Sequence, residues 1–99
     1  MKEIWKFAIS VKDKQAVQMP KEAKILCVQV QREIPCIWAL VDSSIEFEPR
    51  IFVTKGTGHA HPDETWKTLK YIGSYQLSVI HKDSFVGHVF EEIGEKVSE

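Results

Sequence analysis

The amino-acid sequence lacks most of the features that mark specialised protein classes. It has only two cysteines, and no stretch approaches the roughly 20 apolar residues of a membrane helix. Neither charge dominates, since 13 lysine and arginine residues against 14 aspartate and glutamate residues give a net charge of −1. These absences argue against a disulfide scaffold, a membrane-spanning helix and a dedicated nucleic-acid binder, whose affinity needs clustered basic charge.

We expect no secretory signal peptide, because Lys2 and Glu3 lead into alternation over Ile4–Ile9 rather than into a long apolar run. We therefore expect a cytoplasmic protein with reduced thiols. The 99 residues, 43% of them hydrophobic, correspond to one small domain that can bury a core without disulfides. Residues 92–99 form an acidic end that we expect to fray.

Alternating apolar and polar residues predict strands along most of the chain. Many short strands favour a mainly β fold, a small antiparallel β-sandwich or barrel of about six or seven strands with one short helix. The alternative is an α+β sheet with the helix packed on one face. An exposed edge strand could pair with a second copy to form a homodimer. The predicted strands are residues 4–9, 16–19, 25–30, 36–41, 51–55, 71–80 and 85–90, with a weaker candidate at 45–48.

Two hairpins are predicted in the first half of the chain. Residues 16–19 are expected to return alongside the first strand after a polar turn at 12–15. The clearer hairpin joins 25–30 to 36–41 through the polar connection 31–35. Because its second strand is apolar on both faces, we expect that strand at the centre of a sheet.

The two cysteines fall on the facing strands of this hairpin. Whether Cys27 and Cys36 lie opposite each other depends on the register of the strands. Two buried free thiols are favoured over a disulfide in a reducing compartment. A catalytic cysteine is not indicated, since neither thiol has a base nearby in the sequence.

Residues 62–70 form the predicted helix. It begins with proline followed by two acidic residues and ends with lysines, which suits the charges at the two ends of a helix. Trp66 and Leu69, spaced i,i+3, would form its buried stripe. At about two turns, it needs support from the sheet to be stable.

The last two strands are expected to place alternate side chains on opposite faces, with a turn at 81–84 between them. One face of the first of these strands would carry Tyr71, Gly73, Tyr75 and Leu77. The last strand would carry Val86, His88 and Phe90 on one face and Phe85 and Val89 on the other.

The segment Gly56-Thr57-Gly58-His59-Ala60-His61-Pro62-Asp63-Glu64 combines permissive backbone with imidazoles and carboxylates. Its H-x-H-x-D pattern has the form of the metal-binding start of metallo-β-lactamase-type hydrolases. That fold needs about twice this length and further ligands from distant loops, so a polar glycine loop that ends a strand is the favoured interpretation. Weak candidates for a metal site are His59, His61, Asp63 and His88.

The same segment is the best candidate for a contact surface. Freed backbone amides can hold an anion, and a tyrosine can stack on a base. His88 lies between Val86 and Phe90, where a histidine is most often packed and bonded to a carbonyl; the alternative is a ligand-facing role. The predicted ligand- or partner-binding residues are Gly56, Gly58, His59, His61, Tyr71, Tyr75 and His88. No Gly-Lys-Ser/Thr follows the glycines and no G-x-S-x-G occurs, so neither a cofactor nor a catalytic residue is indicated.

The order of motifs resembles a family of small uncharacterised proteins encoded by bacteriophages and prophage-carrying bacteria. The resemblance covers nearly the whole chain. The chain departs from the family pattern at His81-Lys82-Asp83-Ser84, where a glycine-rich turn would be expected. It implies a phage-type accessory protein and assigns no activity to any residue. The motifs that carry it are Lys2–Phe7, Met19-Pro20, Ala23–Gln31, Pro35–Asp42, Gly56–His59, Tyr71–Gln76 and His88–Glu91.

Three functions follow in order of preference. The first is a non-enzymatic protein that binds a host or phage protein, for example to antagonise a host defence. The second is a protein that binds or sequesters a small ligand or nucleotide through the Gly56–His61 loop and Tyr71 or Tyr75. The third is a small metal-dependent enzyme that uses His59, His61 and His88.

Overall fold

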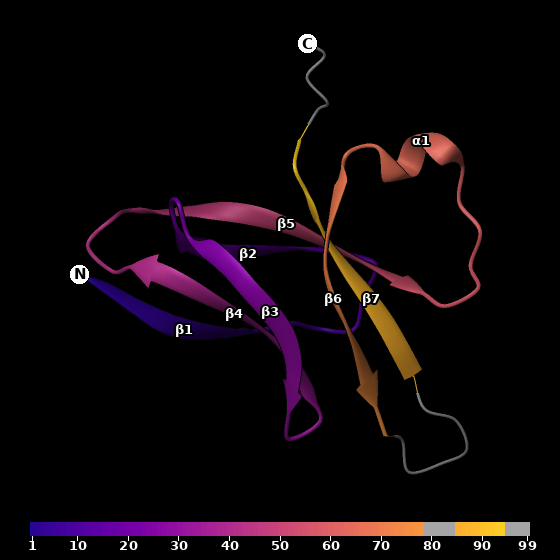
Figure 1. Ribbon diagram of the computed structural model, residues 1–99, viewed down its shortest axis with the longest axis horizontal. Coiled ribbons are helices and arrows are strands. Elements are labelled where there is room, and N and C mark those ends of the chain that lie inside the picture. The colour runs from indigo at the N-terminus through magenta and orange to yellow at the C-terminus, as the bar shows by residue number, and fades with distance from the viewer. Residues whose placement is uncertain (79–84, 95–99) are drawn as a thin grey trace.

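The computed structural model describes residues 1–78 and 85–94, which form seven strands and one short helix (Figure 1). All strand pairs are antiparallel, in a three-stranded sheet A of order β1-β4-β3 and a four-stranded sheet B of order β2-β5-β7-β6. The predicted mainly β architecture with one short helix is confirmed. The elements are β1 (Lys2–Ala8), β2 (Lys14–Pro20), β3 (Lys24–Gln31), β4 (Ile34–Asp42), β5 (Phe47–Gly56), α1 (Asp63–Trp66), β6 (Leu69–Leu77) and β7 (Phe85–Glu92).

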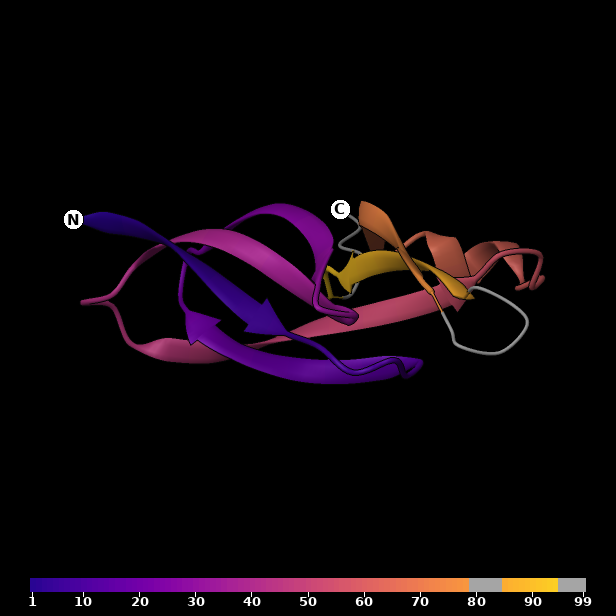
Figure 2. The ribbon, with the colours of Figure 1, turned by 90° about the horizontal axis from the view of Figure 1, so that it is seen from below.

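The two sheets form the layers of a small sandwich (Figure 2). The shortest dimension of the Cα trace is 16 Å, as expected for two sheets stacked about 10 Å apart. β3 of sheet A lies beside β6 of sheet B, so the sheets meet along these two edges (Figure 1). The core between the sheets consists of Ile9, Met19, Ala23, Val28, Ile37, Ala39, Val41, Phe52, Tyr75 and Val89.

The predicted β3–β4 hairpin is confirmed, and β4 is the central strand of sheet A. The prediction of a five-residue connection at 31–35 is wrong, because β3 extends to Gln31 and β4 begins at Ile34. Only Arg32 and Glu33 remain in the turn, with φ of 53° and 64°. Positive φ at both central positions is the pattern of a type I′ turn, whose twist matches that of the strands.

The tight turn also sets the positions of the cysteines. It is centred between Arg32 and Glu33, one residue beyond the register that would bring Cys27 and Cys36 together. Cys27 therefore pairs with Trp38, and both thiols are free. Cys36 is buried as expected, whereas Cys27 is half-buried.

The expectation that the second strand returns along the first is wrong. β2 pairs with β5 in sheet B, while β1 pairs with β4 in sheet A. The chain changes layer after β1, where Ile9 is buried and donates its backbone N–H to the carbonyl of Pro35. Residues 45–48 are not a separate strand either, because β5 begins at Phe47 and runs without interruption to Gly56.

The predicted helix is shorter than expected. α1 covers four residues, and its first-turn acidic residues Asp63 and Glu64 follow Pro62 as anticipated. The expected continuation to Lys70 is wrong because Leu69 already pairs with Glu92 on β7. Strand pairing thus takes over where a second helical turn would begin. Among the described residues, no helix has the length and apolar character needed to cross a membrane.

The predicted acidic tail at 92–99 falls mostly outside the described residues, as do His81 and the turn expected at 81–84. Its first residue, Glu92, still belongs to β7 and forms an ion pair with Lys14 of β2, with 3.3 Å between Nζ and Oε1. The side chains of the final strand alternate between the two faces as predicted, and Val89 faces the core.

A buried ion pair holds the two sheets together. Arg50 of β5 donates to both carboxylate oxygens of Glu91 on β7, at 2.6 Å and 3.0 Å. Its third nitrogen donates to the carbonyl oxygen of Ala23, directly before β3, at 2.8 Å. Hydrogen bonding to Glu91 raises the pKa of Arg50, and the two side chains are only 17% and 12% exposed. The pair therefore links two strands of sheet B to the start of a strand in sheet A.

Tyr75 also faces the core, where its ring lies over Gly87 on the neighbouring strand. A Cβ at Gly87 would stand 2.7 Å from Tyr75 Cζ, so only glycine leaves room for the ring. Tyr75 is 5% exposed, and its hydroxyl has no hydrogen-bond partner. Burial raises the pKa of Tyr75, and the nearby hydroxyl of Thr54 offsets part of that rise. The Thr54 hydroxyl is itself buried and does not meet the geometry of a hydrogen bond.

Arg50→Met is expected to lower the free energy of unfolding by about 3–5 kcal/mol, because it leaves the Glu91 carboxylate buried without its partner. The double variant Arg50→Met/Glu91→Leu should recover most of that loss, since no uncompensated charge remains. Urea denaturation followed by tryptophan fluorescence measures both. The control is Lys21→Met, which breaks the exposed Lys21–Glu46 pair and should cost less than about 1 kcal/mol. A single variant no less stable than this control would contradict the role of the buried pair.

Tyr75→Phe tests the buried phenol. A raised pKa in the folded state means that the contribution of Tyr75 to stability is complete below its ordinary value of 10.0 and is lost as pH rises further. The free energy of unfolding of the wild type should therefore fall more steeply above pH 10 than that of the variant. At pH 7 the variant should be equally stable, or more stable by up to about 1 kcal/mol, because the lost hydroxyl had no partner. Since all other titrating groups are shared, parallel alkaline curves would refute this interpretation.

Candidate functional site

A β-bulge in β6 separates the two tyrosines that the sequence predicts on one face. The register against β7 shifts between Tyr71 and Gly73, so Ile72 is an extra residue on this strand. Tyr75 points into the core, whereas Tyr71 lies on the outer side of sheet B and is 56% exposed. The expectation that both tyrosines share a face is therefore wrong, and only Tyr71 is available at the surface.

On the outer side of sheet B, three hydroxyl groups and one imidazole form a continuous chain of hydrogen bonds. The hydroxyl oxygens of Tyr71 and Ser74 are 2.7 Å apart, and Ser74 Oγ is 2.7 Å from His88 Nδ1. The other ring nitrogen, Nε2, is 2.7 Å from Thr57 Oγ1. A neutral imidazole has one donor and one acceptor nitrogen, so one hydroxyl donates to His88 and the other accepts from it. A packed His88 bonded to a carbonyl was expected; the side chain is half-buried instead, and its partners are hydroxyls.

Aromatic rings extend this surface toward α1. Trp66 and Tyr71 both pack edge-on against Phe90, with ring centroids 5.5 Å apart in each pair. His61 packs edge-on against Trp66 at 5.6 Å. Such arrangements are favoured for aromatic pairs and hold each ring in one orientation. We call this surface the aromatic face; its members are Thr57, His61, Trp66, Tyr71, Ser74, His88 and Phe90.

The glycine loop begins with a tight turn after β5. The N–H of His59 donates to the carbonyl of Gly56 at 3.4 Å, and Gly58 has a φ of 87°. A positive φ at the third residue of a four-residue turn is the pattern of a type II turn, which strongly favours glycine there. Gly56 also leaves room for the His59 ring, because a Cβ at this position would stand 2.9 Å from Cε1 of that ring.

This turn sends the two loop histidines to different sides of the sheet. Gly56 pairs with Gly87, whose open side faces Tyr75 in the core, so the His59 ring lies on the inner side. His61 instead belongs to the aromatic face on the outer side. The extended arrangement in which both imidazoles would reach one ion is therefore not adopted. Among the residues that the structure describes, no group of three histidine, cysteine, aspartate or glutamate side chains is placed to hold a metal ion.

The sequence-predicted site is thus divided. His61, Tyr71 and His88 come together on the aromatic face, while Gly56 and His59 line a hollow of about 420 Å³ with Thr57, Phe85 and Val86, which adjoins the aromatic face at Thr57. Gly58 provides the positive φ of the turn, Tyr75 is buried in the core, and Asp63 is the first residue of α1. Sequence analysis missed Ser74, Thr57 and Phe90 as partners of the predicted residues, because their proximity depends on strand register.

The Ser74–His88 pair resembles the contact between a serine nucleophile and its base, but its surroundings differ from those of a hydrolase. In such enzymes the second ring nitrogen is oriented by a carboxylate, whereas here it meets the Thr57 hydroxyl. No carboxylate among the described residues bonds to His88. The chain of hydrogen bonds holds the hydroxyls and the imidazole in place, and each hydroxyl can donate or accept within it.

Comparison with known proteins adds a family to this geometry. The searches of curated proteins and of solved structures found no match for the chain. A family model described as a domain of unknown function, DUF7352, matches residues 1–99, the whole of the chain. The protein therefore belongs to the family of domains of unknown function DUF7352.

Proposed function

We propose that this chain is a small non-enzymatic binding protein and that the aromatic face is its contact surface for a protein partner. The observation that carries the proposal is the exposure of Trp66 and Tyr71, which are 38% and 56% exposed although both rings are held against Phe90. Tryptophan and tyrosine are the residues most often found at the energetic centres of protein interfaces. Their exposure over the outer side of sheet B, Trp66 from α1 and Tyr71 from β6, supports a contact made by this surface.

The order within the aromatic face supports a binding role. The edge-on packing of the rings and the hydroxyl chain through Ser74 and His88 restrict side-chain motion before a partner arrives. Less conformational entropy is then lost on binding, which improves affinity without further contact area. The hydroxyls supply directional hydrogen bonds beside the rings, a combination that favours a specific partner over general adhesion.

The proposed partner is a host or phage protein in the cytoplasm of a bacterial cell. This part of the proposal rests on the resemblance of the chain to phage- and prophage-encoded proteins, and on the balanced charge of −1, which fits a protein surface better than a phosphate backbone. A small accessory protein of this kind would act by occupying a surface of its target. Antagonism of a host defence protein is one such action.

A second candidate function is the binding of a small ligand in the hollow beside the glycine loop. The observation in its favour is the volume of this open hollow, about 420 Å³, which is lined by Gly56, His59 and Phe85 among others and lies within the range of small-molecule pockets. A panel of nucleotides tested by thermal shift would examine it. Stabilisation that Gly56→Val abolishes would favour this function, whereas no shift with any nucleotide would remove it.

Tyr71→Ser should weaken partner binding by at least about tenfold, the usual effect of losing a central aromatic contact. The tagged protein is used to retrieve partners from a lysate of its bacterial host, and the retained protein is then purified for titration. Phe47→Ser is the matched control, since Phe47 is a 50% exposed aromatic residue packed against Trp5, away from the aromatic face.

The proposal predicts that the partner is retained by the wild type and by Phe47→Ser but lost with Tyr71→Ser. Urea denaturation of all three proteins shows whether the loss arises from unfolding, and Tyr71→Phe, which keeps the ring, should retain most of the binding. Equal retention by Tyr71→Ser, or the absence of any enriched protein, would count against the aromatic face as a contact surface.

A further inference from the structure

The outer side of sheet A is uncovered, on the opposite layer from the aromatic face. β1 and β4 form the outer layer of the sandwich in Figure 2, and no described helix or strand lies over them. Strand register places Ile4, Lys6 and Trp38 on this side. Ile4 is 61% exposed and Leu26 of β3 is 44% exposed, so aliphatic surface meets solvent here.

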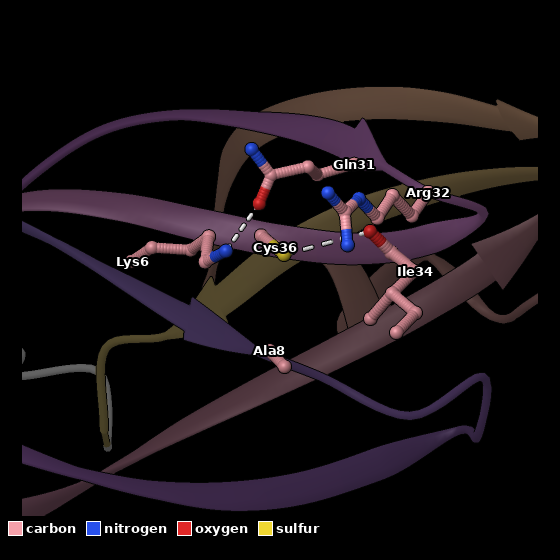
Figure 3. Close-up of a pocket in the computed structure, with 6 residues that line it drawn as sticks. All are labelled: Lys6, Ala8, Gln31, Arg32, Ile34 and Cys36. Atoms are coloured by element: carbon pink, nitrogen blue, oxygen red, sulfur yellow. Dashed lines mark hydrogen bonds between the residues drawn. The ribbon is translucent and has the colours of Figure 1, made fainter.

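Two hollows mark this surface, which we call the sheet A face. The first, of about 330 Å³, is mainly apolar and is lined by Ile4, Leu26, Cys27, Gln29 and Trp38. The second, of about 360 Å³, is lined by Lys6, Ala8, Gln31, Arg32, Ile34 and Cys36 (Figure 3). The buried Cys36 thiol forms part of its floor and donates to the carbonyl of Ile34 at 3.5 Å.

The second hollow is rimmed by positive charge. Lys6 Nζ donates to Oε1 of Gln31 and lies 5.9 Å from the centre of the Trp38 ring, so it stands between the two hollows. Neither Lys6 nor Arg32 forms an ion pair with any described residue. The guanidinium of Arg32, from the β3–β4 turn, and the ammonium of Lys6, from β1, reach over the hollow (Figure 3).

No carboxylate on the strands of sheet A pairs with these cations, and Glu33 in the β3–β4 turn instead accepts from the N–H of Ser78 at 3.1 Å. Sheet A lies wholly within the described residues, and register places only one acidic strand residue, Asp42, on its outer side. Asp42 is opposite Lys2 at the far end of the sheet and accepts hydrogen bonds from the hydroxyl and the N–H of Ser44, at 2.6 Å and 3.0 Å. These bonds lower the pKa of Asp42, which keeps its charge engaged at that end.

The spacing of the hollows matches that of an extended chain. They lie over Trp38 and Cys36, two residues apart on β4, which corresponds to about 7 Å along a strand. In an extended peptide, residues i and i+2 point the same way and have the same separation. An aliphatic side chain and a carboxylate two positions apart would therefore reach both hollows at once.

We infer that the sheet A face binds an extended acidic segment of a partner protein. An aliphatic side chain enters the hollow at Trp38, and a carboxylate two residues away lies between Lys6 and Arg32. Charge complementarity favours this occupant over a second copy of the chain, because two sheet A faces in contact would bring their unpaired cations together. The inference does not rest on the proposed function, since it concerns a different layer of the sandwich.

The test uses a short fluorescent peptide of threonine and serine with one leucine and one aspartate two positions apart. Anisotropy at low salt should show binding that weakens about tenfold when lysine replaces the aspartate. Lys6→Glu and, separately, Arg32→Asn should each weaken binding of the aspartate peptide by about tenfold. Asparagine tolerates the positive φ of 53° at Arg32, so the second variant should fold. Lys12→Glu, in the exposed turn after β1, is the control with the same charge change and should bind normally.

A charge exchange makes the test decisive. The lysine peptide should bind Lys6→Glu more tightly than it binds the wild type, because the new pair restores attraction. Three outcomes would overturn the inference: no binding of the aspartate peptide at about 1 mM, equal binding of the aspartate and lysine peptides, or affinities unchanged by both variants. An oligonucleotide that binds more tightly than the aspartate peptide, or a sedimenting dimer that Lys6→Glu dissociates, would assign the face to a nucleic acid or to a second copy instead.

Discussion

The structure depends on the buried pair between Arg50 and Glu91. A guanidinium and a carboxylate that are largely removed from water are stable only together, and here the guanidinium also satisfies the carbonyl of Ala23. Three chain segments are thereby tied at one point: β5 and β7 in sheet B, and the start of β3 in sheet A. Because Glu91 must stay with Arg50, the preceding residue of β7, Phe90, is fixed on the outer side, where Trp66 and Tyr71 pack on it. The register of β7 against its neighbours therefore fixes both the buried ion pair and the arrangement of the exposed rings.

A sandwich of two small sheets uses its inner faces for the core and leaves two outer faces with separate chemistry. On sheet B, the bulge at Ile72 turns Tyr71 outward while Ile72 itself packs against the core. One extra residue therefore supplies both packing and an exposed ring. On sheet A, the twist of a two-residue turn presents Arg32 beside the outward lysine of β1. The aromatic face offers rings and neutral hydroxyls, and the sheet A face offers aliphatic surface and cations, so the two faces suit different ligands.

Much of the fold follows from local pattern. Alternation predicted most of the strands, and apolar residues on both sides of 36–41 predicted the central place of β4. The errors arose where pairing between distant segments overrides local preference. Residues 67–70 contain helix-favouring lysines, but the chain turns at 67 and 68 and residues 69 and 70 pair with β7. Nothing local to residues 16–19 indicates that they belong to the other sheet.

The candidate site was less predictable because it depends on register. Sequence analysis identified His61, Tyr71 and His88 by residue type, but the contacts of His88 with Ser74 and Thr57 follow from which residues face each other across β6, β7 and the end of β5. The H-x-H-x-D pattern was misleading for the same reason. Alternation brings two histidines together only in an extended chain, and the turn at Gly58 ends the extended conformation before His59. That turn leaves Thr57 within hydrogen-bond distance of His88 and places His59 against Gly56, so the glycines of this segment act by separating the imidazoles that the pattern seemed to pair.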